Sequence, residues 1–234
     1  MKYGLFLKIS VILVFVIVIG YLLTKRFIFF KTKSKYINSL EDFVPHTFQD
    51  IFTMIYEPAH PEKTIIYLYD REGNISYYGR ELNKIRDNSN ARIVAFDYTG
   101  YGKSRGIPSE NQSQTDTAVI VNFVQKNYDT HPENIILFGQ GIGCSIALYT
   151  AFRFRIPKII FYNYSAGMRP WISEKLGPMK FLSRFFSDFN PKNYRSSYMG
   201  EIYNLIDEKY RNIHTDLNGI NVIGWDQIEL KTTD

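Results

Sequence analysis

Short, continuous apolar runs alternate with amphipathic stretches through the middle of the chain. Such runs are typical of strands that are buried on both faces of a parallel sheet, and the stretches between them have helical periodicity. We therefore expect strands at residues 47–56, 64–68, 92–97, 134–138 and 158–162, and helices at residues 79–87, 113–128 and 142–152.

This alternation predicts the α/β class, with crossover helices covering a mostly parallel sheet in three layers. Beyond about Phe189 the pattern becomes polar and predicts no regular element. The C-terminal part of the domain is therefore expected to be truncated or divergent.

The N-terminal segment departs from this pattern. Residues 9–23 are almost uninterrupted apolar, and with residues 5–7 the stretch approaches the roughly 20 residues that span a bilayer as a helix. The pattern predicts an N-terminal transmembrane anchor with a basic linker at residues 1–35, followed by an α/β domain at residues 36–234. The basic residues of the linker are Lys25, Arg26, Lys31, Lys33 and Lys35.

A cleaved signal peptide is the alternative interpretation of this segment. The apolar run is not followed by the pair of small residues that marks a cleavage site, so an uncleaved single-pass anchor is favoured. More positive charge follows the segment than precedes it, which predicts that the bulk of the chain lies on the cytoplasmic side. The expected partner of this segment is the lipid bilayer.

Composition narrows the classes of function further. The formal net charge of the 234 residues is +5 and much of the excess lies in the linker, so we expect a membrane partner and no nucleic acid. The single cysteine, Cys144, rules out an intramolecular disulfide. Metal-ligand spacing is absent, and we expect neither a metal nor a cofactor. The histidines are scattered along the chain, at His46, His60, His131 and His214.

The chemistry of the chain centres on the turn after the strand at residues 134–138. A strand, a glycine-flanked turn and a helix form the nucleophile elbow G-x-S-x-G, whose central serine sits on a strained turn above the sheet. Here the central position is a glycine, which has no side chain with which to attack a carbonyl. Glycine also keeps the turn without the steric cost of a side chain at positive φ. The elbow residues are Gly139, Gln140, Gly141, Ile142 and Gly143.

These motifs together resemble the α/β-hydrolase family, particularly its membrane-anchored, Bem46-like branch of serine hydrolases. The run at residues 97–104, Asp-Tyr-Thr-Gly-Tyr-Gly-Lys-Ser, is similar to D-Y-R-G-Y-G-x-S of that branch, with Thr99 in place of the usual arginine. Residues 68–75 resemble its L-H-G-N-A-G-N-I, and residues 132–148 resemble the segment around its nucleophile. The resemblance covers somewhat under half of the chain.

The chain departs from the family pattern at the residues that would carry out the family's chemistry. The H-G-N segment of the family helps to build the oxyanion hole, and Tyr69, Asp70 and Arg71 stand there in this chain. The negative charge of Asp70 has the wrong sign for stabilising a developing oxyanion.

The remaining triad members are also in doubt. The family order is serine, then an acid, then histidine. The run at residues 221–226 is a weak match to the strand and turn that carry the acid, which would make Asp226 the acid. No histidine follows it, since the last one is His214.

We therefore expect a membrane-anchored pseudohydrolase that binds a lipid, an acyl group or a protein partner. One alternative is a working esterase, lipase or thioesterase with an unconventional nucleophile, for which Cys144 in the first turn of the following helix is a weak candidate. The other alternative is an inert structural membrane protein.

Overall fold

The computed structural model describes residues 2–28, 35–37, 40–164, 169–185, 189, 192–205, 221–225 and 228. The strands are β1 (Val44–Phe48), β2 (Ile51–Tyr56), β3 (Thr64–Leu68), β4 (Arg92–Phe96), β5 (Ile135–Gln140), β6 (Lys158–Tyr162), β7 (Glu201–Leu205) and β8 (Asn221–Ile223). The α-helices are α1 (Lys2–Ile28), α2 (Gly79–Asp87), α3 (Glu110–Asn127), α4 (Gly143–Phe154), α5 (Arg169–Leu176) and α6 (Lys192–Arg195). Short 3-10 helices are η1 (Ile75–Tyr78), η2 (Pro132–Asn134) and η3 (Gly177–Phe185).

The strands form one eight-stranded sheet in the order β1-β2-β4-β3-β5-β6-β7-β8. β2 runs antiparallel to both of its neighbours, and the pairs from β4 to β8 are all parallel. The predicted mostly parallel sheet of an α/β protein is therefore confirmed.

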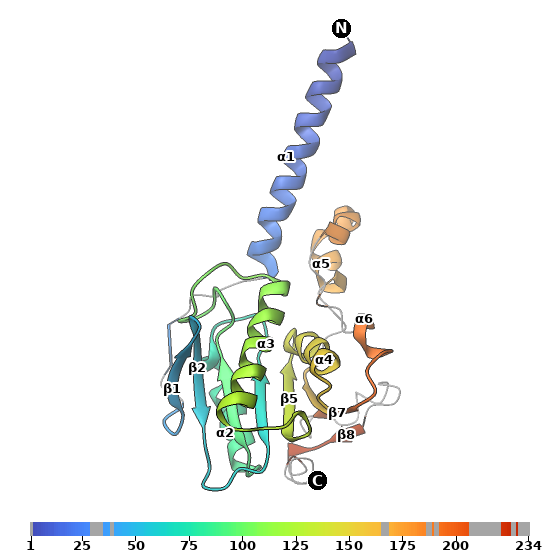
Figure 1. Ribbon diagram of the computed structural model, residues 1–234. Helices are drawn as coiled ribbons and strands as arrows, with labels where there is room; N and C mark the ends of the chain where they lie inside the picture. Colours follow the sequence, from blue (N-terminus) through green and yellow to red (C-terminus); the bar gives the residue numbers. More distant parts are fainter. Residues whose placement is uncertain are drawn as a thin grey trace.

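Helices cover the two faces of this sheet. α3 and α4 pack against each other on one face, where they lie in front of the sheet in Figure 1. The step from β3 to β4 runs along the sheet in the direction opposite to the steps from β4 to β5 and from β5 to β6. Because parallel crossovers are right-handed, α2 belongs on the other face. The result is the predicted three-layer arrangement.

The central strands explain why the sequence pattern was readable. Every residue of β3, β4 and β5 is buried, as expected for parallel strands that are covered on both faces. β3 and β5 are neighbours in register, with Leu68 opposite Gly139. This pairing brings the residues that follow β3 next to the turn that follows β5.

Two expectations about the elements need correction. The segment expected as one strand at residues 47–56 is a hairpin of β1 and β2. Gln49 and Asp50 both adopt positive φ, 47° and 63°, which gives the tight two-residue turn that suits two twisted strands. The region after residue 189, where only a weak match to a strand and turn at residues 221–226 was expected, contributes α6, β7 and β8, and both strands extend the parallel sheet.

The apolar N-terminal segment forms the helix α1, which extends away from the sheet in Figure 1. Large apolar side chains along it are exposed, including Phe6 at 77% and Val11 at 62%. Among the residues that the structure describes, no helix combines the length and the hydropathy needed to cross a membrane.

A short strap, residues 35–37, follows the linker and lies on the sheet domain. The Tyr36 hydroxyl donates a hydrogen bond to Asp97, and its ring packs edge-on against Phe52 with 5.5 Å between centroids. The backbone N–H of Ile37 donates to Ser76 Oγ at 2.8 Å. The start of the domain is thereby fixed to the turns that follow β3 and β4.

Candidate functional site

The turn between β5 and α4 has the geometry of a nucleophile elbow. β5 ends at Gln140, Gly141 adopts φ +56°, and α4 begins at Gly143. The backbone N–H of Gly141 donates to the carbonyl of Tyr162 at 3.3 Å, which holds the turn against the end of β6. The central position of the elbow therefore lies above the carboxyl edge of the sheet and carries no side chain.

The flanking glycines permit a close approach of helix and strands. A Cβ atom at Gly139 would lie 2.7 Å from the backbone of Gly143 and Cys144, and one at Gly143 would overlap the carbonyl of Leu68 at the end of β3. Backbone atoms at such distances have no room to yield. These two glycines are required by the packing of α4 on β5 and β3.

Gly141 faces a carboxylate. A Cβ atom at this position would overlap the carboxyl group of Asp70, which follows β3 in the neighbouring loop. The positive φ of Gly141 adds a second reason for glycine. The volume in which a nucleophile would stand is thus filled by the side chain of Asp70.

Asp70 also occupies the hydrogen-bond donors of the site. Its Oδ1 accepts from the backbone N–H of Ile142 at 3.1 Å and from the backbone N–H of Arg71 at 2.8 Å. The first N–H belongs to the residue after the nucleophile position, and the second belongs to the loop after β3. These are the two places from which the oxyanion hole of an α/β hydrolase draws its donors.

Tyr69 has become part of the core. It is fully buried, and its hydroxyl donates to Asp97 Oδ1 at 3.3 Å. Its ring packs against those of Tyr78 and Tyr98, with centroids 5.0 and 4.7 Å away. Burial, and next the nearby charge of Asp97, raise the pKa of Tyr69 well above its ordinary value. Tyr69 is therefore a neutral packing residue beside the elbow.

Asp97, at the end of β4, braces the turns around the site. Its carboxylate accepts from Tyr36 and Tyr69 and from the backbone N–H groups of Ile75 at 3.0 Å and Lys103 at 2.9 Å. Burial raises the pKa of Asp97, and these hydrogen bonds oppose that shift. The carboxylate thereby organises the loops after β3 and β4.

Thr99, in the turn after β4, is held by a different carboxylate. Its backbone N–H and hydroxyl donate to Asp116 of α3 at 2.6 and 2.9 Å. Burial raises the pKa of Asp116, and hydrogen bonds from Thr99 and Gln112 oppose the rise. The turn after β4 is thereby tied to α3.

Cys144 lies beneath the elbow. Its side chain is fully buried, and its Sγ lies 3.1 Å from the carbonyl oxygen of Gly139, to which it donates. Ser145, the next residue of α4, is also buried. Neither side chain is presented at the tip of the turn where a substrate carbonyl would lie.

The described histidines lie away from the elbow. His60 and His131 precede β3 and η2, so both are at the amino edge of the sheet, opposite Gly141. His46 is on β1, an edge strand that β2, β4 and β3 separate from β5. Asp226 and His214 lie outside the described residues.

The described residues offer no metal centre, because no three of their His, Cys, Asp or Glu side chains are grouped closely enough to hold an ion.

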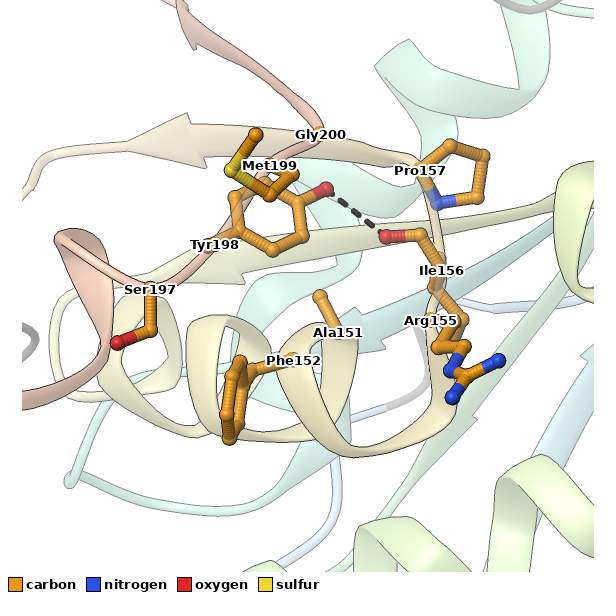
Figure 2. Close-up of a pocket in the computed structure, with 9 residues that line it drawn as sticks. All are labelled: Ala151, Phe152, Arg155, Ile156, Pro157, Ser197, Tyr198, Met199 and Gly200. Atoms are coloured by element: carbon orange, nitrogen blue, oxygen red, sulfur yellow. Dashed lines mark hydrogen bonds between the residues drawn. The ribbon is translucent and has the colours of Figure 1, made fainter.

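A groove lies at the opposite edge of the sheet from the elbow. Figure 2 shows it between the end of α4 and the segment that precedes β7, with a volume of about 470 Å³. Its floor is apolar, and Tyr198 closes one side by donating a hydrogen bond to the carbonyl of Ile156 at 2.8 Å. The lining residues are Ala151, Phe152, Arg155, Ile156, Pro157, Ser197, Tyr198, Met199 and Gly200.

Comparison with known proteins agrees with this fold. No family model matches the chain. It is 33% identical over 89 residues to a putative alpha/beta hydrolase of Acanthamoeba polyphaga mimivirus, which covers 38% of this chain and 34% of the relative. It is 36% identical over 74 residues to alpha/beta hydrolase domain-containing protein 17C of Xenopus tropicalis, which covers 32% of this chain and 24% of the relative. The chain thus spans about a third or less of the length of the curated relatives it matches.

Solved structures give the same answer over most of the chain. An alpha-beta hydrolase from Vibrio vulnificus superposes with a TM-score of 0.61 at 16% identity, covering 82% of this chain and 80% of its own. An esterase from Pyrococcus furiosus superposes with a TM-score of 0.57 at 17% identity, covering 86% and 91%. The protein therefore has the α/β-hydrolase fold, as its sequence predicted.

The contact of Asp70 with the elbow is a feature of the site that the sequence did not predict. The wrong sign of Asp70 was expected, but its direct contact with the Gly141 position and with both backbone donors was not. The sequence names both residues, since Asp70 follows the expected strand at 64–68 and Gly141 is central in the glycine-flanked turn after the expected strand at 134–138. Gly141 leaves the space that the side chain of Asp70 fills.

Proposed function

We propose that this protein is a pseudohydrolase, which uses the α/β-hydrolase fold for binding and does not hydrolyse esters. The observation that carries the proposal is Gly141 at the tip of the elbow, where a serine hydrolase presents its attacking oxygen. Removing the nucleophile alone costs about a millionfold in turnover in a serine protease.

The surroundings of Gly141 support the same conclusion. The backbone donors that would stabilise an oxyanion already serve Asp70, and none of the described histidines is near the elbow. Loss of one oxyanion donor typically costs about 10²–10³ in kcat. Several independent parts of the hydrolase machinery are therefore missing together.

The test is labelling of the purified full-length chain, in detergent, with a fluorophosphonate probe. We expect no labelling and no release of p-nitrophenol from p-nitrophenyl butyrate, while an esterase of the same fold reacts under the same conditions. Specific labelling of the wild-type chain would refute the proposal.

The competing function, a hydrolase with Cys144 as its nucleophile, makes a different prediction. Ester hydrolysis would then be present in the wild type, lost in Cys144→Ala and retained in Glu133→Gln, an exposed control in η2. We expect both variants to match an inactive wild type, because the Cys144 side chain is buried beneath the turn.

The second part of the proposal is attachment to a membrane, with the sheet domain on the cytoplasmic side. It is supported by the exposed apolar side chains of α1 and by the basic residues that follow them. Carbonate extraction of membranes should leave the full chain in the pellet, and protease added to sealed cells should leave the sheet domain intact. Release by carbonate, or cleavage of the domain from outside, would contradict this part.

The third part names the ligand class. We propose that the groove of Figure 2 holds an apolar chain with an acidic head group, such as a fatty acid. Its volume lies in the range of ligand pockets, and Arg155 is the charged residue among its lining residues. A head group of negative charge would therefore meet a complementary partner at the rim.

Displacement of a fluorescent fatty acid by dodecanoate measures this binding. We expect Ser197→Trp, which places a large ring at an exposed lining residue of the groove, to abolish it, and Arg155→Gln to weaken it for dodecanoate but not for dodecanol. Asn111→Trp, on the exposed face of α3, is the matched control. An absence of binding by the wild type would favour an inert structural protein.

A further inference from the structure

The strongest unassigned feature is the contact between the loop after β3 and the elbow. Asp70 is half-buried, yet its carboxylate lies on the Gly141 position and accepts from two backbone N–H groups of different segments. Nothing in the sheet itself requires an acid here, since Leu68 is the last residue of β3 and Asp70 lies in the loop beyond it.

We propose that Asp70 is a built-in ligand of the elbow: its carboxylate closes an anion site made by the N–H groups of Arg71 and Ile142 and excludes any side chain at position 141. The proposal concerns occupancy of the site and stability, so it does not depend on the absence of hydrolysis.

Steric exclusion is the first line of support. A Cβ at position 141 would overlap the carboxyl carbon and both carboxyl oxygens of Asp70, so a side chain at either position displaces the other. The family pattern has glycine at the position of Asp70 and serine at the position of Gly141. In this chain the side chain stands at position 70 and the glycine at position 141, the reverse of the family pattern.

Hydrogen bonding is the second line of support. Backbone N–H groups near a helix start that converge on one point favour a negative charge. Ile142 provides one such group at the start of α4, and Arg71 provides the other from the opposite loop. A single oxygen, Asp70 Oδ1, accepts both, which is the arrangement in which an oxyanion or a small carboxylate would be held.

The exchange is tested by a cycle of full-length variants: wild type, Gly141→Ser, Asp70→Gly and the double variant. Thermal unfolding in detergent is the readout. We expect Gly141→Ser to lower the melting temperature by about 4 °C or more. The double variant should melt above Gly141→Ser although it carries one more change. If the double variant melts at or below Gly141→Ser, so that the losses in melting temperature of the two single variants add, the proposed mutual exclusion of side chains at positions 70 and 141 is wrong.

A second series tests the anion site without touching position 141. Asp70→Asn keeps an oxygen that can accept both N–H groups but loses the negative charge, so it should melt between the wild type and Asp70→Leu, which should melt several degrees below the wild type. Glu72→Leu, at an exposed neighbouring carboxylate, is the matched control. Equal melting of Asp70→Asn and Asp70→Leu would overturn the proposal.

The third arm supplies the ligand from outside. In Asp70→Ala, sodium acetate should raise the melting temperature relative to sodium chloride at the same ionic strength. The wild type, whose site is already filled, should respond to the two salts alike. An Asp70→Ala variant that does not distinguish acetate from chloride would show that the two N–H groups do not form an anion site.

Discussion

Two buried carboxylates, Asp97 and Asp116, hold the loops at the carboxyl edge of the sheet. Both have a raised pKa because burial disfavours the charged form, and in both cases hydrogen bonds oppose the rise. The groups that oppose the rise are hydrogen-bond donors from several segments: Tyr36, Tyr69, Ile75 and Lys103 at Asp97, and Thr99 and Gln112 at Asp116. Such residues position backbone, and their titration is coupled to folding.

Asp97 predicts a pH dependence with a definite sign. Because its pKa is raised in the folded chain, the folded state binds the proton more tightly than the unfolded state. Its contribution to stability is therefore fully present below the unfolded pKa of about 3.9 and declines as pH rises through the raised pKa. The free energy of unfolding of the wild type, minus that of Asp97→Asn, should decrease from pH 4 upward in urea titrations.

Glu133→Gln, at an exposed carboxylate, is the control variant measured in parallel. A difference that grows with pH would mean that the hydrogen bonds from Tyr36, Ile75 and Lys103 outweigh the effect of burial.

Gly143 is predicted to be the least replaceable glycine of the elbow. Its added Cβ would meet backbone carbonyls after β3, including that of Tyr69 at 3.0 Å. Because backbone cannot rotate away, Gly143→Ala should destabilise the domain by about 3 kcal/mol or more. Gly20→Ala, in the open surroundings of α1, should leave the thermal unfolding of the sheet domain unchanged. Equal melting of both variants would contradict the close approach of α4 and β3.

At this scale the sequence revealed identities but not contacts. Gly139 and Gly143 could be expected from the elbow motif, because that motif is a short continuous segment of the sequence. The position of Asp70 could not, because residues 70 and 141 are brought together only by the pairing of β3 with β5. The buried position of Tyr69 has the same origin, since its ring partners come from η1 and from the turn after β4.

Among the elements, α3 begins three residues before the helix expected at residues 113–128, because Ser109 caps it. The Ser109 side chain accepts from the backbone N–H of Gln112 at 3.1 Å and satisfies one of the free donors of the first turn. Ser109→Ala should therefore cost about 1 kcal/mol of stability, and Ser109→Asp should retain most of it. Urea unfolding measures both variants. An unchanged Ser109→Ala would show that water replaces the cap.

Elements with strong periodicity were the predictable ones. The helix expected at 79–87 is α2 residue for residue, and β3 and β6 also match their expected bounds. The β1–β2 hairpin was merged into one strand because its turn residues, Gln49 and Asp50, lack the glycine that usually marks such turns. β7 was missed because polar residues interrupt it, and its burial comes from the neighbouring strand β6.

For the molecule as a whole, the strap at residues 35–37 defines where the domain begins. The hydrogen bonds from Tyr36 to Asp97 and from Ile37 to Ser76 attach the strap to the surface of the sheet domain. A chain that starts at residue 35 should melt at the temperature of the full chain, whereas one that starts at residue 40 should melt several degrees lower.

Tyr36→Phe in the full chain isolates one bond of the strap. It removes a donor from a buried carboxylate and should cost about 1–3 kcal/mol. If the chain that starts at residue 40 melts like the full chain, the strap contributes nothing to the domain's stability.

The contact between Asp70 and Gly141 makes the two positions depend on each other. Serine introduced at position 141 alone would overlap the carboxylate of Asp70, and glycine introduced at position 70 alone would leave two N–H groups without this acceptor. Either single change should therefore give a less stable chain. A side chain at the tip of the elbow would be tolerated only if both positions changed together.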